Sequence, residues 1–209
     1  MKKLILFFTV VAIVLSFSGC SLNKTASIHE KVQKMLTELE SYEADTTITR
    51  ISNKGENTYG AKQWYLISGE YKMEMVSPED VAGNYTIYNG SKVCQYNPKM
   101  NTAVAIEVEE NQARNELFLG QFIKNYLKSE DVVVNVVENL EEGTSTVLEA
   151  IIPGNYKYTA TEKLWVDNKT ILPTRLVIYD TDGNERYIIE YNEFVYNGNI
   201  DPKVFEITN

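Results

Sequence analysis

Histidine and cysteine are scarce in this chain, which has one histidine, His29, and two cysteines, Cys20 and Cys94, among its 209 residues. A single histidine cannot build a histidine-rich zinc site, and neither an HExxH nor a CxxC spacing occurs. The 11 glycines stand singly, so there is no glycine-rich phosphate loop, and a GxSxG motif is also missing. We therefore expect no catalytic residues, no metal and no cofactor, and an enzyme acting on polysaccharide is the least favoured interpretation.

Basic residues are in the minority, with 20 lysines and arginines against 29 acidic residues and a formal net charge of −9. Nucleic acids and anionic membrane faces attract clusters of positive charge, so this chain is a poor candidate for either partner. Its 14 tyrosines and seven phenylalanines are typical of β-rich structure, and its length suits one sizeable core. We predict a single folded domain that binds no nucleic acid.

The long apolar run of the sequence lies at residues 4–17, directly after Lys2 and Lys3. Fourteen residues in a helix rise about 21 Å at 1.5 Å each. That length is short of the roughly 30 Å hydrocarbon core of a membrane. The run therefore indicates a signal peptide rather than a transmembrane anchor.

The segment FSGC at residues 17–20 resembles the lipobox of bacterial lipoproteins, in which the cysteine is acylated and becomes the first residue. Phe17 takes a position where leucine, valine or isoleucine is usual. We predict a lipoprotein signal peptide over residues 1–19, palmitate-type lipidation of Cys20 and a lipidated tether over residues 20–26. Two acyl chains would hold the protein on the extracytoplasmic face of a bacterial membrane. The alternative is an ordinary secreted protein.

A lipid on Cys20 would leave Cys94 without a disulfide partner in the chain. Cys94 lies in KVCQY, a strand-like stretch, where a cysteine most often acts as a small buried hydrophobe. A nucleophilic Cys94 would need a base, and His29 is not obviously near it.

Two segments show the apolar periodicity of amphipathic helices. The first follows Ser27, which forms a capping box with Glu30, and its apolar stripe starts at Ile28. The second is predicted over residues 112–128, with Asn111 as its cap. Both stripes must pack against another element.

Most of the remaining chain alternates between apolar and polar residues, as β-strands do. Asn89-Gly90 and Asp182-Gly183 predict tight turns between paired strands. About ten strands in meandering antiparallel order, with two helices, predict an α+β domain over residues 27–209. We expect a large curved antiparallel sheet whose helices cover its apolar side.

In each of two strands, three side chains at alternate positions lie on one face, and we assign these faces to the apolar side of the sheet. They are the candidates for an apolar cavity or for a core face: Tyr71, Met73, Met75, Tyr187, Ile189 and Tyr191. Core packing is the simpler interpretation of the many strand aromatics, and an apolar cleft or a partner surface is the alternative. Bulky side chains at these positions favour a filled core.

The order of several motifs resembles the LolA/LolB-like lipoprotein family. The motifs are a lysine-bearing strand that ends in proline, an Asx-Gly hairpin followed by tyrosine, and a Lys-apolar-Trp-apolar-Asp…Pro segment before an Asp-Gly hairpin. They correspond to Pro78; Asn89, Gly90 and Tyr96; and Lys163, Trp165, Asp167 and Pro173. The resemblance implies an incomplete antiparallel β-barrel with helices closing its open, hydrophobic side. In carriers of that family the cavity holds lipoprotein acyl chains.

Within that family, the short lipoprotein layout resembles the GerS-type germination lipoproteins of spore-forming anaerobic bacteria. This resemblance implies a non-enzymatic, membrane-tethered partner of a zinc-dependent cell-wall N-acetylmuramoyl-L-alanine amidase. The pair would give spore cortex peptidoglycan its muramic-lactam, which germination requires, at a forespore or spore membrane. The alternative function is a lipid- or lipoprotein-binding carrier or chaperone. An exposed edge strand could also pair two copies into a homodimer.

Overall fold

The computed structural model describes residues 26–109, 112–113, 115–129, 133–139 and 143–207. The predicted signal peptide, Cys20 and most of the tether lie outside this part, as does Asn111. None of the helices within these ranges is long and apolar enough to cross a membrane.

Within these ranges, eleven antiparallel strands form one sheet, in the order β6-β5-β4-β3-β2-β1-β11-β10-β9-β8-β7. The first and last strands pair at its centre, so the chain is two meanders joined along β1 and β11. The strands are β1 (Ser41–Ser52), β2 (Gly55–Leu66), β3 (Tyr71–Ser77), β4 (Tyr85–Tyr88), β5 (Lys92–Asn97), β6 (Thr102–Glu107), β7 (Val133–Asn139), β8 (Gly143–Tyr156), β9 (Thr159–Asp167), β10 (Pro173–Tyr179) and β11 (Glu185–Tyr196).

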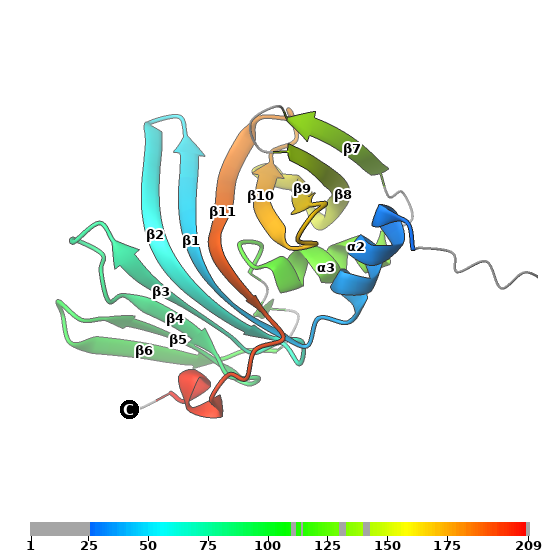
Figure 1. The fold of residues 1–209 in the computed structure, drawn as a ribbon. Coiled ribbons are helices and arrows are strands. Elements are labelled where there is room, and N and C mark those ends of the chain that lie inside the picture. The colour runs from blue at the N-terminus through cyan, green and yellow to red at the C-terminus, as the bar shows by residue number, and fades with distance from the viewer. Residues whose placement is uncertain (1–25, 110–111, 114, 130–132, 140–142, 208–209) are drawn as a thin grey trace, which may run out of the picture.

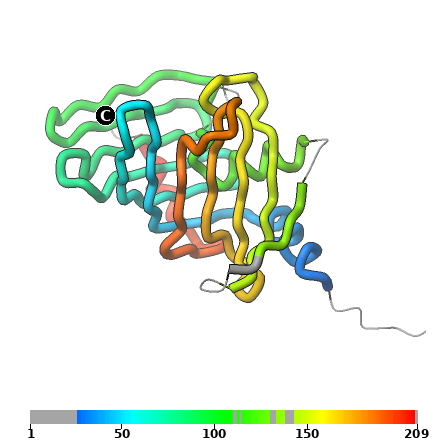
Figure 2. The backbone as a smooth tube through the Cα atoms, turned by 90° about the horizontal axis from the view of Figure 1, so that it is seen from above, coloured from blue at the N-terminus to red at the C-terminus, as the bar shows by residue number. Residues whose placement is uncertain are grey.

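The sheet is open and strongly twisted (Figure 1). Figure 2 shows that strands β3–β6 run across the direction of β8–β11, as accumulated right-handed strand twist produces. The helices lie inside the curl made by β8–β11, while β3–β6 splay away from them (Figure 1). The predicted large curved antiparallel sheet with helices on its apolar side is therefore confirmed, as an incomplete rather than a closed barrel.

Helix α2 (Ile28–Thr37) begins where the sequence predicts. Glu30 N donates to Ser27 Oγ at 3.2 Å and Ser27 N donates to Glu30 Oε2 at 2.6 Å, which completes the capping box. Its buried side chains include Val32 and Leu36. Tyr196 at the end of β11 fixes the helix to the sheet, because its hydroxyl donates to Met35 O at 3.0 Å.

Helix α3 (Leu119–Lys128) is shorter than the predicted helix over 112–128, and this prediction was wrong at its start. Asn115 explains the difference. Its Oδ1 accepts from Leu117 N at 3.1 Å and its carbonyl accepts from Phe118 N at 3.2 Å. A side chain that satisfies the backbone in this way favours a turn over a helix.

Both predicted tight turns are present, with Gly90 at φ +93° and Gly183 at φ +80°. A short 3-10 helix, η2 (Pro202–Phe205), follows the sheet, and Phe205 is buried. Cys94 is free and buried, as expected, and its burial raises the pKa of the thiol.

Candidate functional site

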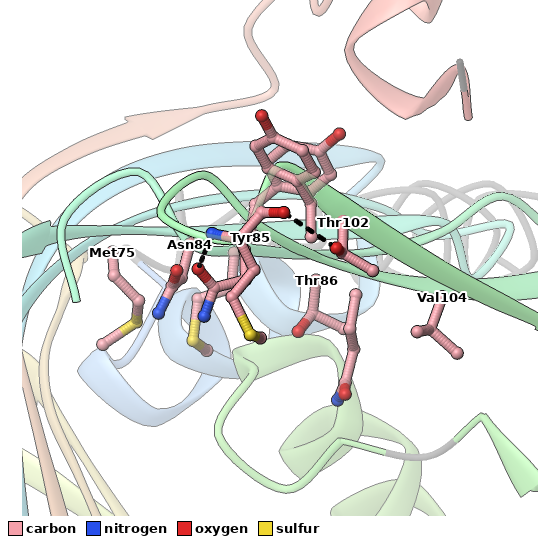
Figure 3. Close-up of a pocket in the computed structure, with 11 residues that line it drawn as sticks. Met75, Asn84, Tyr85, Thr86, Thr102 and Val104 are labelled. Carbon is pink, nitrogen blue, oxygen red and sulfur yellow. Dashed lines mark hydrogen bonds between the residues drawn. The ribbon is translucent and has the colours of Figure 1, made fainter. Parts of the chain in front are cut away.

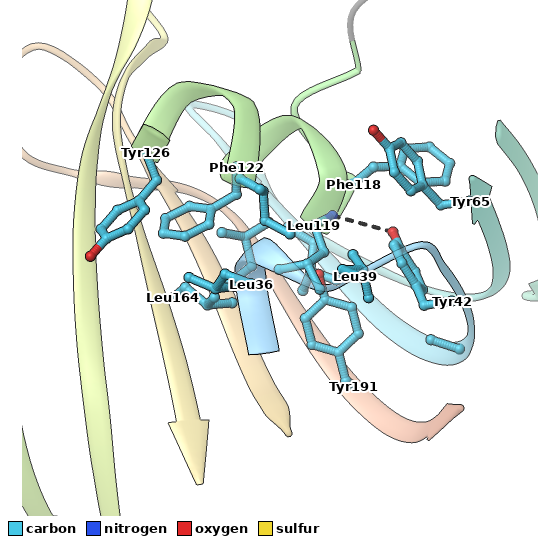
Figure 4. Packing of buried hydrophobic residues seen from close by; sticks show 14 of the residues in the cluster. Leu36, Leu39, Tyr42, Tyr65, Phe118, Leu119, Phe122, Tyr126, Leu164 and Tyr191 are labelled. Atoms are coloured by element: carbon cyan, nitrogen blue, oxygen red, sulfur yellow. Dashed lines mark hydrogen bonds between the residues drawn. The ribbon is translucent and has the colours of Figure 1, made fainter. Parts of the chain in front are cut away.

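The concave face of strands β8–β11 is filled by side chains of the two helices (Figure 4). Phe122 of α3 and Leu36 of α2 are at most 1% exposed, as are Leu164 and Leu176 on the sheet beneath them. Beside α3, toward β2–β4, the remaining space is about 20 Å³. That is room for about one water molecule, so the helices do not cover a large empty cavity here.

A buried hydrogen-bond chain holds the start of α3 on the sheet. The Tyr42 hydroxyl donates to Gln63 Oε1 at 2.9 Å and accepts from Leu119 N at 3.2 Å (Figure 4). Gln63 Nε2 donates to Leu117 O at 3.1 Å. Because unpaired buried polar groups are costly, these bonds define one position for the helix. Burial raises the pKa of Tyr42 well above its ordinary value, so the hydroxyl keeps its proton.

One carboxylate missed by sequence reasoning, Glu162, lies fully buried on the same concave face. Asn125 Nδ2 of α3 donates to Glu162 Oε1 at 2.7 Å. Burial, and then the nearby charge of Glu162, raise the pKa of Tyr191. The alternation along β9 could have predicted this burial. Glu162 stands two residues before Leu164, so both side chains lie on the same face of the strand.

The six candidate cavity residues all lie on or against the concave core, but in different surroundings. Ile189 and Tyr191 are buried under the helices, and Tyr71 is buried against Tyr88 and Phe118. Burial, with the neighbouring Tyr88, raises the pKa of Tyr71 to about 12. The other three, Met73, Met75 and Tyr187, line two separate grooves.

The first of these, which we call the methionine groove, lies on the part of the sheet that the helices leave uncovered. It has a volume of about 440 Å³, and its lining includes Met73, Met75, Met100, Thr86, Gln95 and Val104. Figure 3 shows Met75, Thr86 and Val104 projecting from one side of the sheet and the ring of Tyr85 on the other. The groove therefore continues the apolar concave face toward the β6 edge.

The second, which we call the cationic groove, lies between the tip of the β1–β2 hairpin and the starts of β9 and β11. It has a volume of about 520 Å³, and its lining includes Arg50, Lys54, Asn57, Tyr158, Arg186 and Tyr187. Sequence reasoning missed it because its residues are up to 137 positions apart (Arg50 to Tyr187) and meet through the β1–β11 pairing.

The convex face of β1–β3 carries charged and aromatic side chains in register. Lys62 Nζ lies 2.8 Å from Glu43 Oε1, and Lys72 Nζ lies 3.0 Å from Glu74 Oε2 and 5.2 Å from the ring centre of Trp64. Ion pairs this exposed contribute little to stability, about 0–1 kcal/mol each. This face is the solvated outer side that the alternation of Lys72 and Glu74 predicts.

The edge strand β6 is the most exposed strand whose side chains are all described. All six of its residues are exposed, including Val104 at 60% and Ile106 at 57%, and among the described residues β5 is the strand that pairs with it. A strand at the edge of a sheet presents backbone groups with which an added strand can pair. Among the residues that the structure describes, no three histidine, cysteine or carboxylate side chains gather where they could hold a metal ion.

An open antiparallel sheet with helices in its concave face is the incomplete barrel that the resemblance to LolA-like proteins implied. The chain belongs to the family described as sporulation protein YdcC-like, whose model matches residues 1–205. It is 19% identical to sporulation protein YdcC of Bacillus subtilis (strain 168), over 98% of this chain and 60% of that protein. The chain therefore spans about three fifths of the length of this curated relative.

Two solved structures extend the comparison. The complex of the CwlD amidase with the GerS lipoprotein from Clostridioides difficile matches with 28% identity, a TM-score of 0.52, and coverage of 84% of this chain and 100% of that chain. A LolA superfamily protein from Nitrosomonas europaea matches with 12% identity, a TM-score of 0.43, and coverage of 88% and 99%. The predicted relationship to GerS is confirmed by the first of these matches together with the sporulation family.

Proposed function

We propose that this chain is a non-enzymatic lipoprotein that works in sporulation as the binding partner of a cell-wall amidase. Through that amidase it would allow cortex peptidoglycan to acquire the muramic-lactam needed for germination. The observation that carries the proposal is the 28% identity, over 84% of this chain, to a structure in which the GerS lipoprotein is bound to the CwlD amidase. The match to a sporulation family agrees with it.

The edge strand β6 is the surface we assign to the amidase. An added strand would pair with its free backbone groups, while the exposed Val104 and Ile106 would pack against apolar side chains of the partner. Pairing with β6 of a second copy, which would make a homodimer, is the competing use of the same edge.

Lipidation of Cys20 after removal of residues 1–19 would hold the protein on the extracytoplasmic face of a forespore or spore membrane. Residues 20–26 would act as the tether between the lipid and α2. Labelling with a fatty-acid analogue tests this part. Loss of the label in a Cys20→Ser variant supports it, and an unlabelled wild-type protein contradicts it.

A lipid- or lipoprotein-binding function is the second candidate, and the methionine groove is the observation in its favour. Against it, side chains fill the concave face under the helices, where a LolA-type carrier would hold acyl chains. Mass spectrometry of lipids extracted from the purified protein separates the candidates. A stoichiometric lipid that a Met73→Lys variant loses would establish the carrier function.

The amidase proposal is tested by co-expressing the protein from residue 21 with the amidase and measuring the mass of the complex by light scattering. We expect a complex with the wild type and none with a Val104→Lys/Ile106→Lys variant, because two charges would be buried in the contact. Ile151→Lys/Val195→Lys is the matched control, since these residues are 54% and 53% exposed on interior strands. Equal binding by both variants would contradict the assignment to β6.

A further inference from the structure

The cationic groove concentrates positive charge on a chain whose net charge is −9. Its lining includes Arg50, Lys54 and Arg186, and no aspartate or glutamate among the residues that the structure describes. Within the described part of the chain, Arg50 and Lys54 form no ion pair. A ligand that carries negative charge would therefore meet two uncompensated cations there.

Arg186 is held in place before any ligand arrives. Its Nε donates to Asp180 Oδ2 at 2.8 Å, and its guanidinium lies 5.3 Å from the ring centre of Tyr158. Burial of Asp180 works against its ionisation, but hydrogen bonds from Asn184, Arg186 and the Asp182 amide outweigh it and lower its pKa to about 2. Asp180 also pairs with a terminal nitrogen of this guanidinium, so Arg186 is a fixed, partly compensated cation in the wall of the groove and loses little side-chain freedom when a ligand binds.

The other lining groups suit a sugar. Tyr158 is 55% exposed, and Lys157 Nζ lies 5.5 Å from its ring centre in addition to the Arg186 guanidinium. The part of the ring that these cations leave open is an apolar surface for the C–H groups of a pyranose. Asn53 and Asn57 supply amide donors and acceptors for hydroxyl groups. The volume of about 520 Å³ lies within the range of about 300–1,000 Å³ for ligand sites.

We propose that the cationic groove binds an anionic polysaccharide, with Arg50 and Lys54 pairing with its acidic groups and Tyr158 stacking on a sugar ring. This inference rests on the proposed function and deepens it. A groove that binds the polysaccharide would hold this protein, and the amidase bound to it, at the cell wall. Carboxylates of peptidoglycan and phosphates of a cell-wall phosphodiester polymer share this chemistry. The groove lies on β1, β2 and β11, and β3, β4 and β5 separate these strands from β6, so the two sites can be altered independently.

The test is co-sedimentation of the protein, from residue 21 onward, with insoluble cell-wall sacculi. The decisive variant is Arg50→Glu/Lys54→Glu. Lys31→Glu/Lys34→Glu is the matched control, since it changes the net charge equally on the exposed side of α2. We expect the groove variant to bind about tenfold more weakly or worse, a loss of at least about 1.4 kcal/mol. The control should bind like the wild type, and added salt should weaken both.

Chemical treatment of the sacculi distinguishes the two sources of charge. Removal of phosphodiester polymers with hydrofluoric acid leaves binding intact if peptidoglycan carboxylates are the ligand, and amidation of those carboxylates then abolishes it. The reverse pattern identifies the phosphate polymer. Circular dichroism verifies that each variant is folded. The Arg50→Gln/Lys54→Gln variant removes the two positive charges without adding negative ones, and it should also bind the sacculi more weakly than the wild type.

Three outcomes would overturn the inference: no sedimentation of the wild type, equal sedimentation of the groove variant, or groove-dependent binding to anionic lipid vesicles in place of sacculi. Amidase association is measured in parallel. Groove-dependent sedimentation without an amidase complex would overturn the proposed function and leave the glycan site standing. Loss of the amidase complex in the groove variant would instead assign the groove to the amidase.

Discussion

The two ends of the sheet have the same antiparallel construction and opposite surroundings. We call β8–β11 with α2 and α3 the covered half, and β3–β6 the open half. In the covered half Leu164 and Leu176 are 0% exposed, whereas in the open half Val104 is 60% exposed. Tyr71 of the open half is still buried, at 6% exposed, so the apolar concave face is core under the helices and becomes surface at the β6 edge. The two helices cause this difference in burial. We therefore expect the covered half to supply most of the stability and the β6 edge of the open half to bind the partner.

The largest effect should follow from a truncation in the covered half. Leu164→Ala should lower the free energy of unfolding by about 2–5 kcal/mol, because it leaves a cavity in a filled core. Val104→Ala in the open half should change it by less than about 0.5 kcal/mol. Urea denaturation measures both. Similar losses of unfolding free energy at the two positions would contradict the difference in packing between the covered and the open half.

The contact between α3 and the sheet is tight at Gly120. A Cβ added there would stand 1.9 Å from Tyr65 Cζ, so Gly120→Ala should destabilise the protein by about 1–3 kcal/mol, although alanine is the better helix former. Lys128→Ala, at the exposed end of the same helix, is the control. Combining Gly120→Ala with Tyr65→Leu should recover part of the loss, and a stabilised Gly120→Ala protein would show that the helix is not seated on Tyr65.

Two glutamines, Gln63 on β2 where α3 meets the sheet and Gln95 on β5 in the open half, compare a covered with an uncovered position of identical chemistry. Gln63 is 0% exposed and bonded to Tyr42 and Leu117, whereas Gln95 is exposed beside the methionine groove. Gln63→Leu should cost about 1–3 kcal/mol, because it leaves buried polar groups without partners. Gln95→Leu should cost little. Equal costs in thermal or urea unfolding would contradict the anchoring of α3 to β1 and β2 by this hydrogen-bond chain.

The smallest effect concerns acid stability at the cationic groove. The pKa of Asp180 is about 2 in the folded protein and about 3.9 when unfolded, so the unfolded state binds the proton more readily. Its contribution to stability is present above about pH 4 and is lost as the pH falls toward 2. Asp180→Asn should flatten this part of the stability profile, and Asp182→Asn should not. An unchanged profile in Asp180→Asn would contradict the role given to the pair with Arg186.

Local signals in the sequence predict the strands, the two tight turns and α2, because each depends on neighbours such as Ser27 and Glu30. The start of α3 escaped prediction, since the turn at Asn115 competes with a helix that the apolar stripe alone favours. The grooves escaped as well. Arg50 and Tyr187 are register partners across β1 and β11, and no local pattern encodes a pairing between residues so far apart in the chain.

The most direct test of the amidase-partner proposal is the muropeptide composition of spore cortex from cells that lack this protein, determined by liquid chromatography and mass spectrometry. We predict that muramic-lactam muropeptides are lost, and that the wild-type gene restores them while the Val104→Lys/Ile106→Lys form does not. A cortex with unchanged muramic-lactam content in the absence of the protein would contradict the proposal.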